Sequence, residues 1–508
     1  MDTYRINAIG ITVIVGVAAL WIGLNAATAQ LETIMWVSGV STLITCALLG
    51  KKIWMIIPFA MALNVTLTIP GRPSTMLLAQ GLFCGFSVLL IMLRRLPIRV
   101  RFNELDFWVL LITLFVFQAY LRNPVGLNIF GGDSVGARPY AIFVATLSTY
   151  FFLSHIQIPT ADLKWLLRIH IIGGLLNFAV LSIGYFVPRV GIFIGSSSAS
   201  SISSTNFQTG TYGVAVATRV GFLRDISNNI AIWVSAFKSP IKACFHPIWA
   251  PLILISFALA ALSGFRNEIA AIGFTYFVAI AYRGGFPSIM IATAIMLIGI
   301  VGLAIINIAS PLPANVQRSL SFLPGSWDAA IVKDAQDSTD WRVEMWIEAL
   351  STDHWIKNKA LGDGLGMTRE QLNYIQSFGS GFTLAQGASK YSKLSLQQEF
   401  MMATNDYHSG PVSTIRTIGY SGLAVFLTAM IRLAMHAHRV ITRARNTTWF
   451  PLSLLVGIPI IWNPVFFTFL YADFGTSISS FLMGVAFVSI LKNNLPSPDT
   501  DQVAVKSL

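Results

Sequence analysis

The sequence predicts an all-α fold, that of a polytopic helical membrane protein with about 12–14 transmembrane spans and one large loop on the outer, periplasmic face. Hydrophobic residues make up 55% of the chain and charged residues only 11%, whereas about 25% of a typical soluble domain is charged. Apolar stretches of about 20 residues recur along the whole chain, and each could cross a hydrocarbon core about 30 Å thick. A transmembrane barrel would instead show alternating segments of about 10 residues.

Apolar length alone locates the expected spans. They lie near 7–25, 31–49, 53–69, 75–93, 105–121, 139–157, 165–187, 211–236, 248–264, 267–282, 287–309, 415–434, 449–466 and 474–491. The first also has the features of a signal peptide, and we favour an uncleaved span because another apolar segment follows at once. The eighth is interrupted by Arg219, Arg224 and Asp225.

Lys and Arg in the short loops set the expected orientation, because they collect on the cytoplasmic side of membrane proteins. The basic loops are "GKK" at 50–52, "RRLPIRVR" at 94–101, "KSPIK" at 238–242, "YRGG" at 282–285 and "HAHRVITRAR" at 436–445. They fall between alternate spans only if the eighth span is counted. Both termini are then cytoplasmic, and a Ser-rich loop (195–206) faces outward.

Four regions follow from this threading. Residues 1–309 form transmembrane helices, and 310–414 form a large outer loop with helical elements. Residues 415–491 form the C-terminal transmembrane helices, and 492–508 a disordered cytoplasmic tail. A loop of about 100 residues is far longer than a connection needs, which favours a function for it.

Charge and cysteine content exclude other classes. A net charge of +12 would suggest nucleic acid in a soluble protein. Here it reflects the cytoplasmic loops, and no aromatic–basic stripe or nucleic-acid-binding motif is present, so no nucleic-acid partner is expected. Cys46, Cys84 and Cys244 lie in or next to apolar spans without metal-ligand spacing. We interpret them as buried hydrophobic residues, and no metal site is predicted.

Two arginines stand at the outer ends of spans. Arg266, in "SGFRNE", separates two apolar runs. A snorkelling arginine at a helix end is the simple explanation. Arg219 lies deeper, in the outer half of the eighth span, where an ionisable group is costly and faces a cavity or a partner. Asp225 is a possible structural partner for it, so a site role and a structural role both remain open for Arg219.

The outer loop contains a third arginine on an amphipathic helix. "DSTDWRVEMWIEAL" reads as a helix capped by Asp, Ser or Thr within 337–340. Arg342 shares a face with Trp346 and Ala349 by i, i+4 and i+7 spacing, whereas Glu344 and Glu348 share the other. An inward-facing arginine needs an anionic partner, either protein or ligand. The glycines of "LGDGLGM" (361–367) lack the strand and helix of a phosphate loop, so we interpret them as a tight turn.

His408, in "NDYHSG", stands a few residues before a span. Histidine is the side chain best able to exchange a proton near neutral pH, although a lone histidine is more often structural. Asp406 is too close in sequence to be a sure orienting partner.

Three stretches resemble the O-antigen ligase and O-antigen polymerase superfamily of bacterial membrane glycosyltransferases. "LSGFRNEIAAI" is similar to its span-boundary motif with Arg. "WRVEMWIEAL" followed by "LGDGLGM" is similar to its Arg-x-x-x-Trp helix and Gly-x-Gly-x-Gly turn. "HSGPVSTIRTIGYSG" is similar to its His followed by Gly-x-x-Gly, here Gly419 and Gly422. A fourth stretch, "TRVGFLRDISNN", is similar to its Arg-x-x-Gly segment.

The resemblance implies transfer of a glycan from a polyprenyl-pyrophosphate donor to a sugar hydroxyl, on another lipid-linked glycan or on lipid A core, in the bacterial inner membrane. It implies no metal or other cofactor. Arg266, Arg342 and Arg219 would bind the donor pyrophosphate by bidentate hydrogen bonds, and His408 would be the catalytic base. Partners would be the donor, the acceptor and the lipid bilayer, with other polysaccharide-assembly proteins left open.

Two other classes remain as alternatives. One is a flippase or transporter of lipid-linked glycans, which would usually show internal repeats; none is evident in the sequence, nor is an acidic residue buried in mid-span. The other is a non-catalytic membrane scaffold, which would leave the outer arginines and His408 without a purpose.

Overall fold

The computed structural model describes Val13, Val17 and residues 31–67, 72–125, 136–187, 194–196, 220–367, 371, 394–470 and 472–495. The all-α prediction is confirmed, since these residues form helices with one short two-stranded ribbon, β1 (Val65–Leu67) and β2 (Ile194–Ser196). The helices are α2 (Leu31–Leu49), the 3-10 helix η1 (Gly50–Met55), α3 (Ile56–Leu63), α4 (Thr75–Met92), α5 (Glu104–Arg122), α6 (Arg138–His155), α7 (Thr160–Phe186), α10 (Gly221–Phe237), α11 (Pro240–Cys244), α12 (Trp249–Leu262), α13 (Arg266–Ala309), α14 (Ala314–Leu320), α15 (Ala329–Ser351), α17 (Leu396–Ala403), α18 (Gly410–Ala444), α19 (Phe450–Phe469) and α20 (Phe474–Asn494).

Helix length and hydropathy make the chain a multi-pass membrane protein. In the part of the chain that the structure describes, eight helical segments are long and apolar enough to cross a membrane. They are Gly39–Leu63, Thr75–Met92, Glu104–Arg122, Thr160–Phe186, Arg266–Ala309, Gly410–Ala444, Phe450–Phe469 and Phe474–Asn494. Most of the expected first span (7–25), most of the Ser-rich loop (195–206) and the expected tail beyond residue 495 lie outside the described residues.

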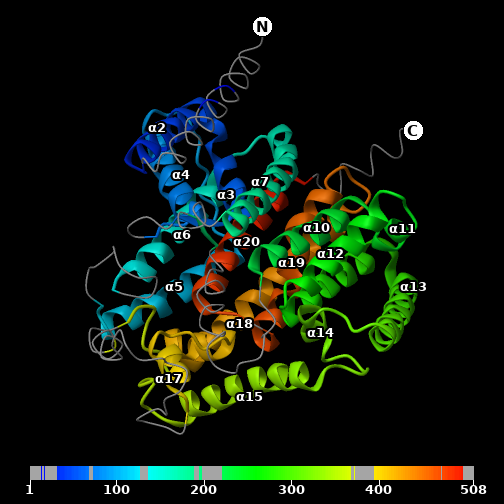
Figure 1. Ribbon diagram of the computed structural model, residues 1–508. Helices are drawn as coiled ribbons and strands as arrows, with labels where there is room; N and C mark the ends of the chain where they lie inside the picture. Colours follow the sequence, from blue (N-terminus) through cyan, green and yellow to red (C-terminus); the bar gives the residue numbers. More distant parts are fainter. Residues whose placement is uncertain are drawn as a thin grey trace.

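The core is built around α18, α19 and α20, which cross the middle of the molecule (Figure 1). Helix α20 is apolar on all sides and is the most deeply buried of the long helices. Phe426 of α18 makes edge-to-face contacts with Phe467, Phe474 and Phe481 at centroid distances of 5.3, 5.3 and 5.7 Å. Such pairs stabilise packing beyond the area that they bury, so the C-terminal helices form the rigid centre of the bundle.

The five basic loops expected on one side of the membrane do lie at one end of the bundle, here called the basic end. Contacts between them link segments far apart in the sequence. These contacts are Ile98 with Ile156, Lys52 with Asp162 at 3.0 Å, His436 with Glu104 at 3.2 Å, Tyr282 with His438 at 2.5 Å, and Arg283 with the Ser235 carbonyl at 3.1 Å. Helix α10 therefore carries the chain from one end to the other, but it is not among the helices long and apolar enough to cross a membrane. Residues 211–219 of the expected eighth span lie outside the described residues.

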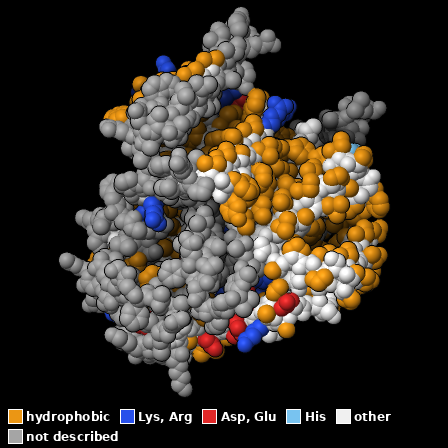
Figure 2. Space-filling model, in the orientation of Figure 1, with side chains coloured by type: hydrophobic (Ala, Val, Ile, Leu, Met, Phe, Trp, Pro, Cys, Tyr) orange, Lys and Arg blue, Asp and Glu red, His pale blue; other side chains and the backbone are white. Residues whose placement is uncertain are grey.

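The remaining connections gather at the opposite end, here called the site end. Helix α13 reaches the basic end at Arg283 and turns back at Gly285, whose φ of 65° and ψ of −162° divide it into two helices without a loop. Its far end returns to the site end, where Asn307 donates to the Ser326 carbonyl at 2.5 Å. Beyond it, α14 and α15 lie across the site end, with α15 along its lower edge in Figure 1. In Figure 2, acidic side chains gather on the same edge, below a broad hydrophobic surface over α12 and α13, whereas Lys and Arg side chains are also visible elsewhere on this face.

Three sequence predictions were wrong in detail. The expected span 53–69 ends as a helix at Leu63, because Asn64 takes a left-handed conformation (φ 37°) and the chain continues as β1, paired with β2. Cys244 is exposed rather than buried, because it ends the short helix α11 at the basic end. Helix α18 begins at Gly410, five residues before the expected 415, because Ser409 caps it with a hydrogen bond from the Val412 amide and Pro411 suits its first turn.

Candidate active site

The seam "SGFRNE" is the tight turn where α12 ends and α13 begins at the site end. Gly264 has a φ of 75°, which favours glycine, and the Ser263 hydroxyl accepts from the Phe265 amide at 3.3 Å. The Ser263 carbonyl accepts from the Val220 amide at 3.0 Å, which attaches the start of α10 to the turn. Arg219 itself lies outside the described residues, but its neighbour Val220 is at the seam.

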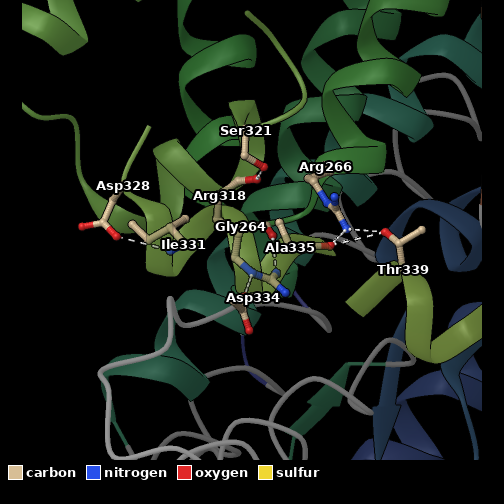
Figure 3. Close-up of polar contacts among 9 residues, drawn as sticks. All are labelled: Gly264, Arg266, Arg318, Ser321, Asp328, Ile331, Asp334, Ala335 and Thr339. Carbon is tan, nitrogen blue, oxygen red and sulfur yellow. Dashed lines mark hydrogen bonds and ion pairs between the residues drawn. The ribbon is translucent and has the colours of Figure 1, made fainter. Parts of the chain in front are cut away.

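Arg266 opens α13 and reaches sideways to α15 (Figure 3). Its Nη2 donates to the Ala335 carbonyl at 2.7 Å and to the Thr339 hydroxyl at 3.2 Å. Its Nε and Nη1 make no hydrogen bond with the described residues, and no described carboxylate lies within ion-pair distance of it. Arg266 thus joins two helices through neutral acceptors and keeps donor capacity for an anion.

A second seam arginine, Arg318 of α14, has a different environment. Its side chain is buried, its Nε donates to Asp334 Oδ2 at 2.6 Å, and its Nη1 donates to the Gly264 carbonyl at 3.1 Å. Arg318 was not predicted from the sequence, since nothing in its local pattern distinguishes it from other loop arginines. Its partners in the turn between α12 and α13 and in α15 identify it as a clamp that fixes the loop helices on the seam.

Helix α15 is longer than predicted. It begins at Ala329, and its cap is Asp328, whose Oδ1 accepts from the Ala330 amide at 2.8 Å. The predicted cap within 337–340 is wrong, because those residues continue a helix that Arg266 and Arg318 hold at 334–339.

The inward face of α15 follows the expected pattern. Met345 and Ala349 are fully buried, Trp346 packs beside them, and Arg342 is half-buried on the preceding turn. Of the two glutamates expected on the other face, Glu344 is exposed and Glu348 is half-buried. Arg342 therefore lies one turn after the Thr339 contact of Arg266, on a helix whose position is fixed at both ends.

His408 lies directly before α18 in a turn that α15 supports. The Trp346 indole donates to the Tyr407 carbonyl at 2.6 Å, and the ring of Trp341 lies 6.2 Å from that of His408. The imidazole Nδ1 lies 2.8 Å from Asp406 Oδ1, although the angle at the nitrogen is poor for a hydrogen bond. We interpret the contact as an electrostatic one between the imidazole and the Asp406 carboxylate.

The glycine turn 361–367 packs on a break in α18, and Gly362 and Gly364 take positive φ values of 77° and 98°, as expected of glycines in a turn. Gly419 interrupts the helix (φ 77°, ψ 178°), and a Cβ there would overlap the Ala360 carbonyl. A Cβ on Gly362 would overlap the backbone of Thr417 in return. The Gly364 amide donates to the Thr417 carbonyl at 3.0 Å, so the two backbones meet at a distance that side chains would prevent.

Arg416 lies inside this junction and was also missed from the sequence. Its side chain is 1% exposed, and its guanidinium donates to the carbonyl of Gly364 and, at 3.4 Å, to that of Gly366. The quoted motif contains Arg416, yet only the folded turn supplies the carbonyls that explain its burial. Its role is to hold the glycine turn on α18.

Together, these contacts bring three of the four predicted site residues to one helix. Arg266 bonds to α15 at Ala335 and Thr339, Arg342 belongs to α15, and His408 packs on it through Trp341. The stretch from Ala335 to Trp346 is about 16 Å long at 1.5 Å per residue. Cationic donors and a histidine therefore lie along the same short stretch of the site end.

Comparison with protein-family models finds no match to this chain, and comparison with curated protein sequences finds none either. The family resemblance therefore rests on the three motifs themselves.

Proposed function

We propose that the chain is a membrane glycosyltransferase of the O-antigen ligase and polymerase type. It would move a glycan from a polyprenyl-pyrophosphate donor to a sugar hydroxyl on a second glycan or on lipid A core. It would act in the bacterial inner membrane with the site end facing the periplasm. The observation that supports the proposal is the placement of Arg266, Arg342 and His408 on or against the same helix, α15.

The chemistry of the transfer suits these side chains. The acceptor hydroxyl oxygen forms a bond to the anomeric carbon of the donor sugar, and the bond from that carbon to the pyrophosphate oxygen breaks. The electron pair leaves with the pyrophosphate, and the hydroxyl proton goes to His408 Nε2. Negative charge grows on the leaving group, where fixed arginines stabilise it, and Arg266 has uncommitted nitrogens for that purpose.

Asp406 would assist the base. With its carboxylate 2.8 Å from Nδ1, the ring can hold a proton there while Nε2 accepts the one from the acceptor. An imidazolium formed during transfer would be stabilised by the same carboxylate, and general-base catalysis of this kind typically contributes about 10²–10⁴-fold.

Purified protein incubated with lipid-linked glycan and acceptor tests the proposal through release of polyprenyl pyrophosphate. We expect His408→Ala to lose transfer by about 10²-fold or more while still binding donor, because the arginines remain. His354→Ala is the matched control: His354 lies in the same loop and packs on Trp355, burial lowers its pKa, and its loss should be nearly silent. Near wild-type turnover by His408→Ala from pH 6 to 8 would remove His408 as the base.

A further inference from the structure

A crevice far from the candidate active site opens near the basic end. It lies between the first half of α13, α18 and α19, and has a volume of about 390 Å³, within the range of small-ligand sites. Three polar side chains line one part of it, Tyr282, His438 and Arg439, and apolar side chains that include Ile431, Met435 and Ile461 line the rest.

The two kinds of lining are separated along the membrane normal. On α18, Arg439 and His438 lie toward the basic end, and Ile431 lies eight residues earlier, about 12 Å deeper at 1.5 Å per residue. Ile431 and Met435 are exposed, so the deep part opens sideways toward the hydrocarbon of a bilayer. The crevice therefore offers a polar mouth at headgroup level and an apolar channel below it.

The polar mouth has donor capacity that the protein does not use. The Tyr282 hydroxyl lies 2.5 Å from His438 Nδ1. In the tautomer in which Tyr282 donates, the neutral ring carries its proton on Nε2 and can donate it to an anion. Arg439 is exposed and makes no hydrogen bond or ion pair with any residue that the structure describes.

Neighbouring charged side chains already have partners within the protein, which leaves Arg439 as the cation of the crevice. Arg283 donates to the carbonyls of Ser235 and Ala236 at 3.1 and 2.5 Å. Glu104, whose charge is felt at Arg439, already contacts Arg432 at 3.5 Å and His436 at 3.2 Å. An anion entering the mouth therefore finds a positive charge that no described carboxylate neutralises at contact.

We propose that this crevice binds one anionic phospholipid from the leaflet at the basic end. Its phosphate would accept hydrogen bonds from Arg439 and His438 Nε2, and an acyl chain would lie along Ile431, Met435 and Ile461. Basic pockets between membrane helices on the cytoplasmic side are suited to acidic lipid head groups. A soluble phosphate would satisfy the mouth alone and leave the apolar channel uncovered, so the channel favours a lipid. The site is independent of the proposed transfer reaction.

The test uses the full chain purified in neutral detergent and titrated with phosphatidylglycerol or phosphatidylcholine. Native mass spectrometry counts retained lipid, and thermal unfolding reports binding, since a ligand of the folded state stabilises it. We expect one tightly retained phosphatidylglycerol per chain, a higher unfolding temperature with it, and little effect of phosphatidylcholine.

Two variants separate the two halves of the crevice. Arg439→Gln should weaken phosphatidylglycerol binding about 10-fold or more, the scale of one lost charge-assisted contact. Ala434→Trp should fill the channel and weaken binding although Arg439 remains. Arg95→Gln is the matched control, because Arg95 is an exposed arginine of the basic end that does not line the crevice. It should bind as wild type.

Several results would overturn the assignment. Equal losses in Arg439→Gln and Arg95→Gln would mean diffuse attraction to a basic surface rather than a site. Full phosphatidylglycerol binding by Ala434→Trp, with inorganic phosphate raising the unfolding temperature as much as the lipid does, would mean a phosphate site without a chain channel. Absence of any retained lipid in wild type would remove the site. All variants are first required to unfold like wild type without lipid.

Discussion

Substituting Gly419 with alanine tests whether the segment 358–367, which ends in the glycine turn, holds the start of α18. The φ of 77° and ψ of 178° at Gly419 lie in a region that glycine alone adopts readily. Any other residue held in that conformation destabilises the fold by about 1–3 kcal/mol. The new Cβ would also overlap the Ala360 carbonyl. Relief of that overlap would disturb the bonds from the Tyr420 amide to Lys359 O and from Ser421 Oγ to Ala360 O, both 2.8 Å.

The expected destabilisation follows from these contacts. Each hydrogen bond contributes about 1 kcal/mol net, so one or two lost bonds added to the backbone cost give about 2–5 kcal/mol for Gly419→Ala. The measurement is the free energy of unfolding of the purified chain in detergent, titrated with denaturant.

Gly273→Ala is the matched control. Gly273 lies inside α13 with no atom within 4 Å of a Cβ added there. An alanine in mid-helix is more favourable than glycine by about 0.5–1 kcal/mol, so the control should be neutral or slightly stabilising. A difference of less than about 1 kcal/mol between the two variants, well below the expected cost, would refute the packing of the turn on the break in α18.

Three further predictions concern the site end. In a background without native cysteines, an impermeant thiol reagent applied to intact cells should label Ser351→Cys and not Arg445→Cys; the reverse would invert the proposed orientation. Arg266→Lys and Arg342→Lys should each lose most transfer activity at normal expression, because lysine cannot form the planar bidentate fork; full activity in both would mean that these arginines only anchor helices. Asp334→Ala should lower the free energy of unfolding by about 2–3 kcal/mol, because it leaves the buried Arg318 without its carboxylate, and the partial exposure of Asp334 reduces this cost. A free energy of unfolding equal to that of wild type would mean that water compensates Arg318 equally well.

The parts of the fold that sequence could predict are those set by solvent and chain length. A run of about 20 apolar residues must form a helix in hydrocarbon, because its backbone groups have no other partners there. Lys and Arg must stay near one surface, so the loops at 50–52, 94–101 and 436–445 were correctly assigned to one end. Part of the inward face of α15 followed from helical spacing, as the burial of Ala349 and the packing of Trp346 illustrate.

The parts that sequence could not predict depend on partners supplied by other elements. The helix of span 53–69 stops at Leu63, where the chain leaves it to pair with residues more than a hundred positions later. Helix α15 starts at Asp328, since a polar stretch becomes helical once Arg266 and Arg318 bind its flank. The burial of Arg416 depends on carbonyls of a turn about 50 residues away. None of these partners is visible in a local window.

The two seam arginines show why residue type and position do not by themselves define a role. Arg318 is buried, and both its carboxylate and its carbonyl contact are made within the protein, so its charge is already compensated. Arg266 is half-buried, and its described acceptors are a carbonyl and a hydroxyl, neither of which cancels a charge. A cation in a partly desolvated setting gains most from an anion that arrives later. Since Arg318 already fixes α15 on the seam, Arg266 is not needed as the clamp, which makes it the better of the two as a ligand for a pyrophosphate.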